Sequence, residues 1–258
     1  MNLAKIFAVV LLFSQLSNAV IKTETVQYKE GSTELEGYVV YDDALRGGPG
    51  VVIVHDWMGI SDDTKTKAAE LATLGYVAFV ADIYGKGVHP ADQKAAGELA
   101  GKYKGDRQLL RKRALAAYET LKKNPRVNKN KIAAQGYCFG GTTVLEMALS
   151  GAHLQAVTSI HGGLEFPDLQ KDVKKIKGKL LVLHGAIDPY VPAEQVNAFT
   201  KALDGAKTDY QFVAYSGSVH SFTNPKAGND ISKGAAYNPV AEKRAFEATK
   251  TFYAEVLN

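Results

Sequence analysis

The residue best suited to chemistry is Cys138, which lies in the run Gly136-Tyr137-Cys138-Phe139-Gly140. Flanking glycines permit a sharp, strained turn, because a residue without a side chain allows neighbouring backbone to approach closely. The run follows a predicted strand, 131–134, and precedes a helix predicted to begin near Gly140. The positive N-terminus of that helix would favour a thiolate at Cys138. A lone cysteine is often only a small buried hydrophobic residue, but this setting favours a nucleophile.

Two further residues have the types and positions that a thiol nucleophile needs. Asp188 follows the predicted strand 180–183, and His220 follows the predicted strand 210–215. The carboxyl ends of parallel strands meet at one edge of a sheet, so all three side chains can converge there. His220 would exchange a proton with Cys138, and Asp188 would hold the imidazole in the required tautomer. The chain order nucleophile, acid, base is that of α/β hydrolases.

Backbone amides complete the predicted site. Attack on a carbonyl group creates an oxyanion, which two preorganised N–H donors stabilise. The amide of Phe139, directly after the nucleophile, is the first expected donor. The second is the amide of Trp57, in His55-Asp56-Trp57-Met58-Gly59 after the predicted strand 51–54.

Hydrophobic runs predict the framework that positions these residues. Alternating residues at 25–28 and 35–41 indicate an antiparallel hairpin. From Pro49 onward, continuous apolar runs alternate with helical patterns, which is typical of βαβ units. We therefore expect an α/β-hydrolase fold, with a mostly parallel, doubly wound sheet and helices on both faces. The predicted strands are 25–28, 35–41, 51–54, 76–81, 131–134, 156–160, 180–183 and 210–215; the predicted helices are 62–74, 107–123, 140–150, 193–203 and 240–257.

With these motifs the sequence resembles the dienelactone hydrolase (carboxymethylenebutenolidase) family. The matching segments extend from His-Asp-Trp-Met-Gly at 55–59, through Asp-Ile-Tyr-Gly at 82–85 and the cysteine turn, to 217–225. The resemblance implies hydrolysis of a small ester or lactone through an acyl-thioester on Cys138, without metal or organic cofactor. It implies the triad Cys138, Asp188 and His220.

Three positions depart from the family pattern. A glutamate that helps to activate the thiol is replaced by Asp56, which is one methylene shorter. The two arginines that bind the substrate carboxylate correspond to Lys86 and Asn224. Lysine keeps a charge without the bidentate guanidinium geometry, and asparagine has no charge. Asp56 and Lys86 are therefore only possible auxiliary or substrate-binding residues.

The N-terminus indicates export. Residues 1–19 contain Lys5, an uncharged apolar run at 6–16 and the small-x-small site Ser17-Asn18-Ala19, the three parts of a secretory signal peptide. The apolar run is short for a bilayer span, so no stable membrane anchor is expected. We expect residues 20–258 to form one hydrolase domain that is periplasmic in a Gram-negative source and otherwise secreted.

Other functions have less support. Without Lys5, 30 Lys and Arg face 27 Asp and Glu, a charge excess too small to predict nucleic-acid binding. The spacing of His55, His161 and His184 matches no short metal-binding signature and favours packing or pocket roles. Two alternatives to a hydrolase stay open: a non-catalytic binding protein on the same fold, and a thiol-dependent acyltransferase. The sequence leaves the oligomeric state open.

Overall fold

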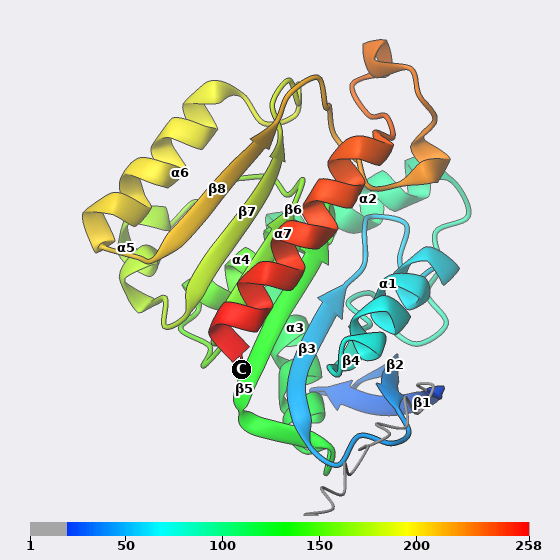
Figure 1. Ribbon diagram of the computed structural model, residues 1–258. Helices are drawn as coiled ribbons and strands as arrows, with labels where there is room; N and C mark the ends of the chain where they lie inside the picture. The colour runs from blue at the N-terminus through cyan, green and yellow to red at the C-terminus, as the bar shows by residue number, and fades with distance from the viewer. Residues whose placement is uncertain (1–19, 258) are drawn as a thin grey trace, which may run out of the picture.

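The computed structural model describes residues 20–257, and the predicted signal peptide, 1–19, lies outside them. Its centre is a twisted eight-stranded sheet of order β1-β2-β4-β3-β5-β6-β7-β8 (Figure 1). β1 pairs antiparallel with β2, and β2 with β4, whereas the remaining pairs are parallel. The strands are β1 (Ile21–Glu30), β2 (Thr33–Asp42), β3 (Gly48–Val54), β4 (Val77–Ala81), β5 (Val127–Tyr137), β6 (Ala156–Ile160), β7 (Lys179–Gly185) and β8 (Tyr210–Tyr215).

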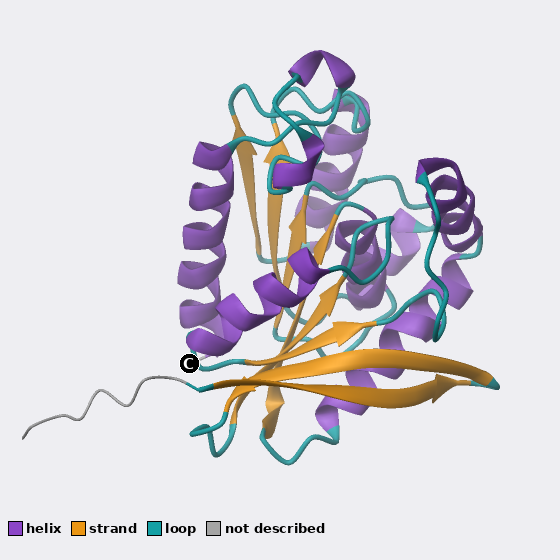
Figure 2. Ribbon diagram, turned by 90° about the vertical axis from the view of Figure 1, so that its right-hand side faces the viewer, coloured by secondary structure: helices purple, strands orange, loops and turns teal. Residues whose placement is uncertain are grey.

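Helices cover both faces of the sheet, as Figure 2 shows. α1 and α7 contribute to the hydrophobic core on one face, and α2, α3, α4 and α6 contribute to the core on the other. No helix among residues 20–257 is long and apolar enough to cross a bilayer. The helices are α1 (Asp62–Thr73), α2 (Gln93–Gly105), α3 (Arg107–Lys122), α4 (Phe139–Leu149), α5 (Leu169–Asp172), α6 (Ala193–Ala206) and α7 (Pro239–Leu257), with short 3₁₀ turns η1 (Val173–Lys175), η2 (Pro225–Ala227) and η3 (Ile231–Lys233).

β3 explains why the parallel strands are apolar throughout. Successive side chains of a strand point to opposite faces. Val52 and Val54 lie in the core beneath α3 and α4, whereas Val51 and Ile53 lie in the core beneath α1. All four are fully buried. A strand covered on both faces has no exposed position for a polar residue, so its sequence does not alternate.

The predicted α/β-hydrolase fold with a mostly parallel sheet is confirmed, but two elements differ from expectation. β5 begins at Val127, earlier than predicted, and its first half is largely exposed. α2 was not predicted at all. Its sequence contains Gly97, Gly101 and Gly105, and each glycine in a helix costs about 1 kcal/mol relative to alanine, which weakens the helical signal.

A network of ion pairs with buried carboxylates joins α3, α4 and α5. Arg111 of α3 donates from Nε to Glu146 of α4 and from Nη2 to Asp172 of α5, each at 2.6 Å. The side chains of Glu146 and Asp172 are only 1% and 3% exposed. Each carboxylate has one further cation beside it: Arg107 lies 3.4 Å from Glu146, and Lys175 lies 2.6 Å from Asp172. Arg111 is the one residue that pairs with both buried carboxylates.

Arg111→Met is expected to lower the free energy of unfolding by about 2 kcal/mol, because each buried carboxylate would lose one of its two charged partners. Urea denaturation measures this loss. The control is Lys250→Met, which removes a pair with Glu247 between half-exposed side chains and should cost less than about 1 kcal/mol. Equal, small losses in the two variants would contradict the importance of the network.

Candidate active site

Cys138 lies in a strained turn between β5 and α4. Its backbone has φ 55° and ψ −115°, a left-handed conformation that non-glycine residues rarely adopt. The neighbouring glycines are required by close packing. A Cβ atom at Gly136 would lie 2.1 Å from the carbonyl oxygen of Gly140, and one at Gly140 would lie 2.2 Å from the carbonyl oxygen of Val54. The turn therefore exists only with glycine at both positions.

The three predicted side chains meet at the carboxyl ends of β5, β7 and β8. His220 Nε2 lies 3.0 Å from Cys138 Sγ, and His220 Nδ1 lies 2.8 Å from Asp188 Oδ2. The side chain of Asp188 is fully buried, and its Oδ1 accepts a hydrogen bond from the amide of Tyr190 at 2.9 Å. The amide of His220 donates to Gly234, so the histidine loop is also fixed by its backbone.

The site favours a charged imidazole. Burial by itself lowers the pKa of His220, but the opposing sulfur of Cys138 and the hydrogen bond with Asp188 outweigh burial and raise the pKa to about 10. Below that pH, His220 can carry a proton on the nitrogen that faces the sulfur of Cys138. The arrangement thus places a thiol and an imidazole that can exchange a proton 3.0 Å apart.

A second histidine, His161, supports the nucleophile from the backbone side. Its Nδ1 accepts a hydrogen bond from the amide of Cys138 at 3.1 Å, and its Nε2 contacts Thr223 Oγ1 at 2.9 Å. Burial, followed by the nearby His220 and Lys67, holds the pKa of His161 well below its usual value, so its ring stays neutral and can accept. The sequence predicted only a packing or pocket role for His161.

The loop after β3 carries the second expected amide donor. Tyr84 Oη donates to the carbonyl of Trp57 at 2.8 Å, and His55 Nδ1 donates to the carbonyl of Asp56 at 2.6 Å. These bonds fix the loop in place. Among residues 20–257, the amides of Trp57 and Phe139 donate to no other group, which leaves both available to a bound molecule.

The side chains of Asp56, Lys86 and Asn224 have partners other than Cys138 and His220. Asp56 Oδ1 accepts from the amide of Met58 at 2.8 Å, and in the described chain it forms no hydrogen bond with Cys138 or His220. Burial raises the pKa of Asp56. Lys86 lies 4.0 Å from Glu36 and does not line the cavity that contains Cys138. The Asn224 side chain caps η2 instead.

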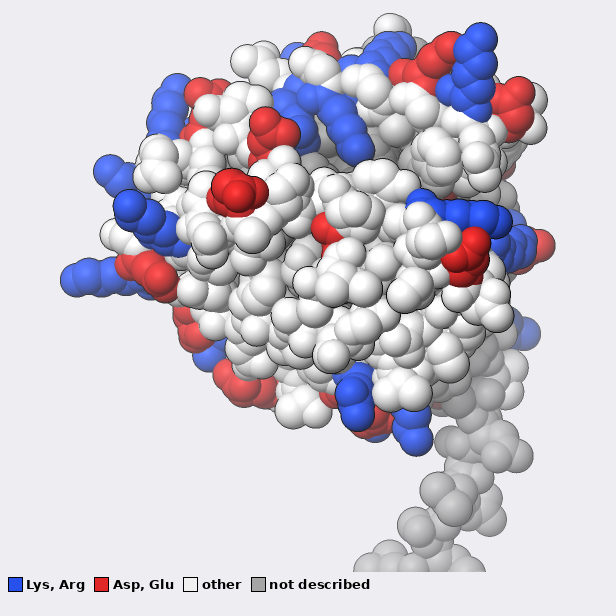
Figure 3. Space-filling model, turned by 90° about the horizontal axis from the view of Figure 1, so that it is seen from above, with Lys and Arg blue, Asp and Glu red and all other residues white. Residues whose placement is uncertain are grey.

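A cavity of about 530 Å³ opens beside Cys138. It lies at the end of the molecule shown in Figure 3, where uncharged residues dominate the middle of the face. The sequence did not predict most of its walls, because these residues lie on α2 or, like Thr142 and Tyr190, belong to no catalytic pattern. The lining residues are Trp57, Gly97, Ala100, Gly101, Lys104, Cys138, Thr142, Gly163, Tyr190, Val191, His220, Ser221 and Ala235.

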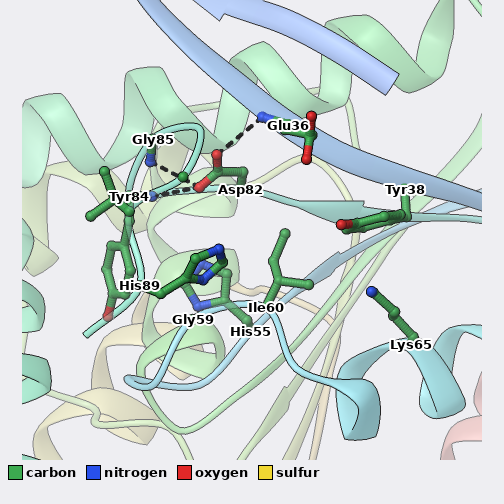
Figure 4. A pocket seen from close by; sticks show the side chains of 12 residues that line it. Glu36, Tyr38, His55, Gly59, Ile60, Lys65, Asp82, Tyr84, Gly85 and His89 are labelled. Atoms are coloured by element: carbon green, nitrogen blue, oxygen red, sulfur yellow. Dashed lines mark hydrogen bonds between the residues drawn. The ribbon is translucent and has the colours of Figure 1, made fainter. Parts of the chain in front are cut away.

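A smaller cavity of about 230 Å³ is lined in part by His55 and Asp82 (Figure 4). Asp82 is fully engaged there: Oδ1 accepts from the amides of Tyr84 and Gly85, and Oδ2 accepts from the amide of Glu36. Asp82 thus fixes the backbone of the Asp-Ile-Tyr-Gly segment, and this positions Tyr84 to donate to the carbonyl of Trp57. No three His, Cys, Asp or Glu side chains within residues 20–257 gather closely enough to hold a metal ion.

Comparison with known proteins shows the family. The model of the dienelactone hydrolase family matches residues 35–257. The chain belongs to the dienelactone hydrolase family. It is therefore a hydrolase that acts on carboxylic ester or lactone bonds.

Individual relatives agree along nearly the whole chain. The solved structure of m3DLH is 37% identical, with a TM-score of 0.87, and the match covers 92% of this chain and 99% of that one. A dienelactone hydrolase-like promiscuous phosphotriesterase from metagenomic libraries is 36% identical, with a TM-score of 0.87 and coverage of 93% and 100%. A putative carboxymethylenebutenolidase of Aquifex aeolicus is 26% identical over 89% of this chain and 97% of its own.

The raised pKa of His220 predicts how the hydrolase reacts with iodoacetamide. At pH 6 His220 is protonated and stabilises the thiolate, so His220→Ala should slow alkylation of Cys138 by at least about tenfold. As the pH rises through about 10, His220 loses its charge and the two rates should converge. Mass spectrometry against time measures both rates. Parallel pH profiles would show that His220 does not stabilise the thiolate.

Proposed function

We propose that the protein hydrolyses small esters or lactones through a covalent thioester on Cys138, with His220 and Asp188 completing a catalytic triad. The observation that carries this proposal is the continuous contact from the buried Asp188 carboxylate through His220 to the sulfur, with distances of 2.8 and 3.0 Å. The sulfur lies on the wall of a cavity large enough for a small molecule.

In the first half of the reaction, the thiolate of Cys138 attacks the carbonyl carbon of the ester. The carbonyl π electrons move to oxygen, and the amides of Phe139 and Trp57 donate to the resulting oxyanion. When the oxyanion collapses, the bond to the alkoxy oxygen breaks and His220 protonates that oxygen as it leaves. The product is an alcohol, or in a lactone the hydroxyl end of the opened ring, and a thioester on Cys138.

In the second half, neutral His220 takes a proton from water as the water oxygen attacks the thioester carbonyl. Collapse of this second oxyanion releases the carboxylic acid and returns the thiolate facing protonated His220. Asp188 accepts a hydrogen bond from Nδ1–H of His220, so Nε2 faces the reacting atoms. If an alcohol attacked in place of water, the same steps would transfer the acyl group, which is the acyltransferase alternative.

Asp188→Asn should lower kcat for p-nitrophenyl acetate by 10³-fold or more, because an amide no longer fixes the productive tautomer. Cys138→Ala should abolish activity. Asp56→Asn is the matched control: asparagine can still accept from the Met58 amide, so kcat should stay within about threefold of the wild type. Stopped-flow and steady-state rates with p-nitrophenyl acetate give kcat for the wild type and the three variants. Full activity in Cys138→Ala would reject the mechanism and favour a non-catalytic role for the cysteine.

We also propose that the protein is exported, to the periplasm in a Gram-negative source and otherwise outside the cell. The support is the order of Lys5, the apolar run and Ser17-Asn18-Ala19 in the sequence. N-terminal sequencing of protein recovered after expression in a Gram-negative host should give a chain that begins at or near Val20. A chain that retains Met1 in the cytoplasmic fraction would refute export.

A further inference from the structure

One wall of the Cys138 cavity comes from a single face of α2. Gly97, Ala100, Gly101 and Lys104 all line the cavity, and their spacing of three, four and seven residues places them on the same side of the helix. Ala100 is buried beneath this face, whereas Gly97 and Gly101 are exposed. The wall is therefore nearly flat and is made of backbone and one methyl group.

Packing does not require these glycines. A Cβ atom at Gly101 would meet nothing within 4 Å, and one at Gly97 would lie an ordinary 3.8 Å from the ring of Trp57. Neither residue has a positive φ. A glycine inside a helix weakens the helix relative to alanine. Gly101 thus destabilises α2 although no packing contact requires a glycine there. Its missing side chain leaves open volume in the cavity.

The same face ends in a positive charge. Among the described residues that line the cavity, Lys104 is the only Lys, Arg, Asp or Glu. It forms no salt bridge with any residue of 20–257. The other lysine considered for anion binding, Lys86, lies beside Glu36 and away from this cavity.

We propose that this face of α2 determines which esters the enzyme prefers: a large, flat apolar group lies along Gly97, Ala100 and Gly101, and Lys104 selects groups that carry a negative charge at the far end. The proposal rests on the proposed function, because it concerns the substrate of the Cys138 site. The flat apolar group of the substrate displaces water from this wall, and the burial of apolar surface favours its binding. The flexible Lys104 side chain provides a point charge at the open end of the cavity.

The steric part is tested with Gly101→Leu and two esters, phenyl acetate and 2-naphthyl acetate. The ratio of kcat/KM for the naphthyl ester to kcat/KM for the phenyl ester should fall by about tenfold, because the added side chain occupies space that the larger ring needs. Tm should not fall, since leucine is a better helix former than glycine. Gly105→Leu, at the last residue of α2 and outside the cavity lining, is the control and should leave the ratio unchanged.

The charge part is tested with Lys104→Met, using 4-acetoxybenzoate and its neutral counterpart 4-acetoxybenzamide. The preference for the anionic ester should fall by about fivefold in 50 mM salt and by less in 1 M salt, where screening already weakens the wild-type attraction. Lys102→Met removes a lysine of α2 that does not line the cavity, and it should keep the wild-type preference.

These measurements separate the inference from the proposed function. If the wild type hydrolyses none of the four esters in a Cys138-dependent manner, the proposed function fails and the inference fails with it. If the wild type hydrolyses them but Gly101→Leu and Gly105→Leu give the same naphthyl-to-phenyl ratio, the α2 wall does not bind the large group. If Lys104→Met and Lys102→Met give equal preferences, Lys104 does not select charge. Either result overturns the inference while the hydrolase mechanism stands.

Discussion

The strained backbone of Cys138 is the constraint on which the rest of the site depends. A left-handed conformation costs a non-glycine residue energy, and it persists only where the surroundings fix it. Here Gly136 of β5 packs against the backbone of α4, and Gly140 of α4 packs against the end of β3, so closely that neither glycine can carry a side chain. His161 adds a hydrogen bond to the amide of Cys138 itself. The turn exposes the sulfur at the end of the sheet and leaves the next amide, that of Phe139, free to donate.

The side chains and amides that surround the sulfur follow other strands, so the site depends on how the parallel strands are aligned in the sheet. His220 and Asp188 follow β8 and β7, and the Trp57 loop follows β3. Parallel strands bring these loops to one edge although they are far apart in the sequence. The loops are then fixed individually: Tyr84 holds Trp57 by its carbonyl, and Tyr190 donates its amide to Asp188. A preorganised site of this kind needs little rearrangement when charge develops on the substrate.

The sequence predicted the eight strands and the convergence of the Cys138, Asp188 and His220 side chains, because buried parallel strands and a glycine-flanked turn have strong local patterns. It did not predict α2, whose glycines weaken the helical signal although tertiary contacts of Ala100 and Tyr103 hold the helix in place. The cavity wall was missed with it. Lys86 and Asp56 were selected by resemblance, but side-chain partners depend on local geometry: one contacts Glu36 and the other the amide of Met58. The sequence also did not predict the hydrogen bond between His161 and Cys138, because the donor is the backbone amide of Cys138.

The proposed mechanism requires that the sulfur of Cys138 becomes acylated during turnover. The most direct test is to mix the protein with p-nitrophenyl acetate, quench with acid within one turnover, and locate the adduct by peptide mass spectrometry. One acetyl group, about 42 Da, should be found on the peptide that contains Cys138, and it should disappear after the substrate is exhausted. Hydrolysis that proceeds with no adduct on Cys138, or with the acetyl group on another residue, would contradict a thioester mechanism at Cys138.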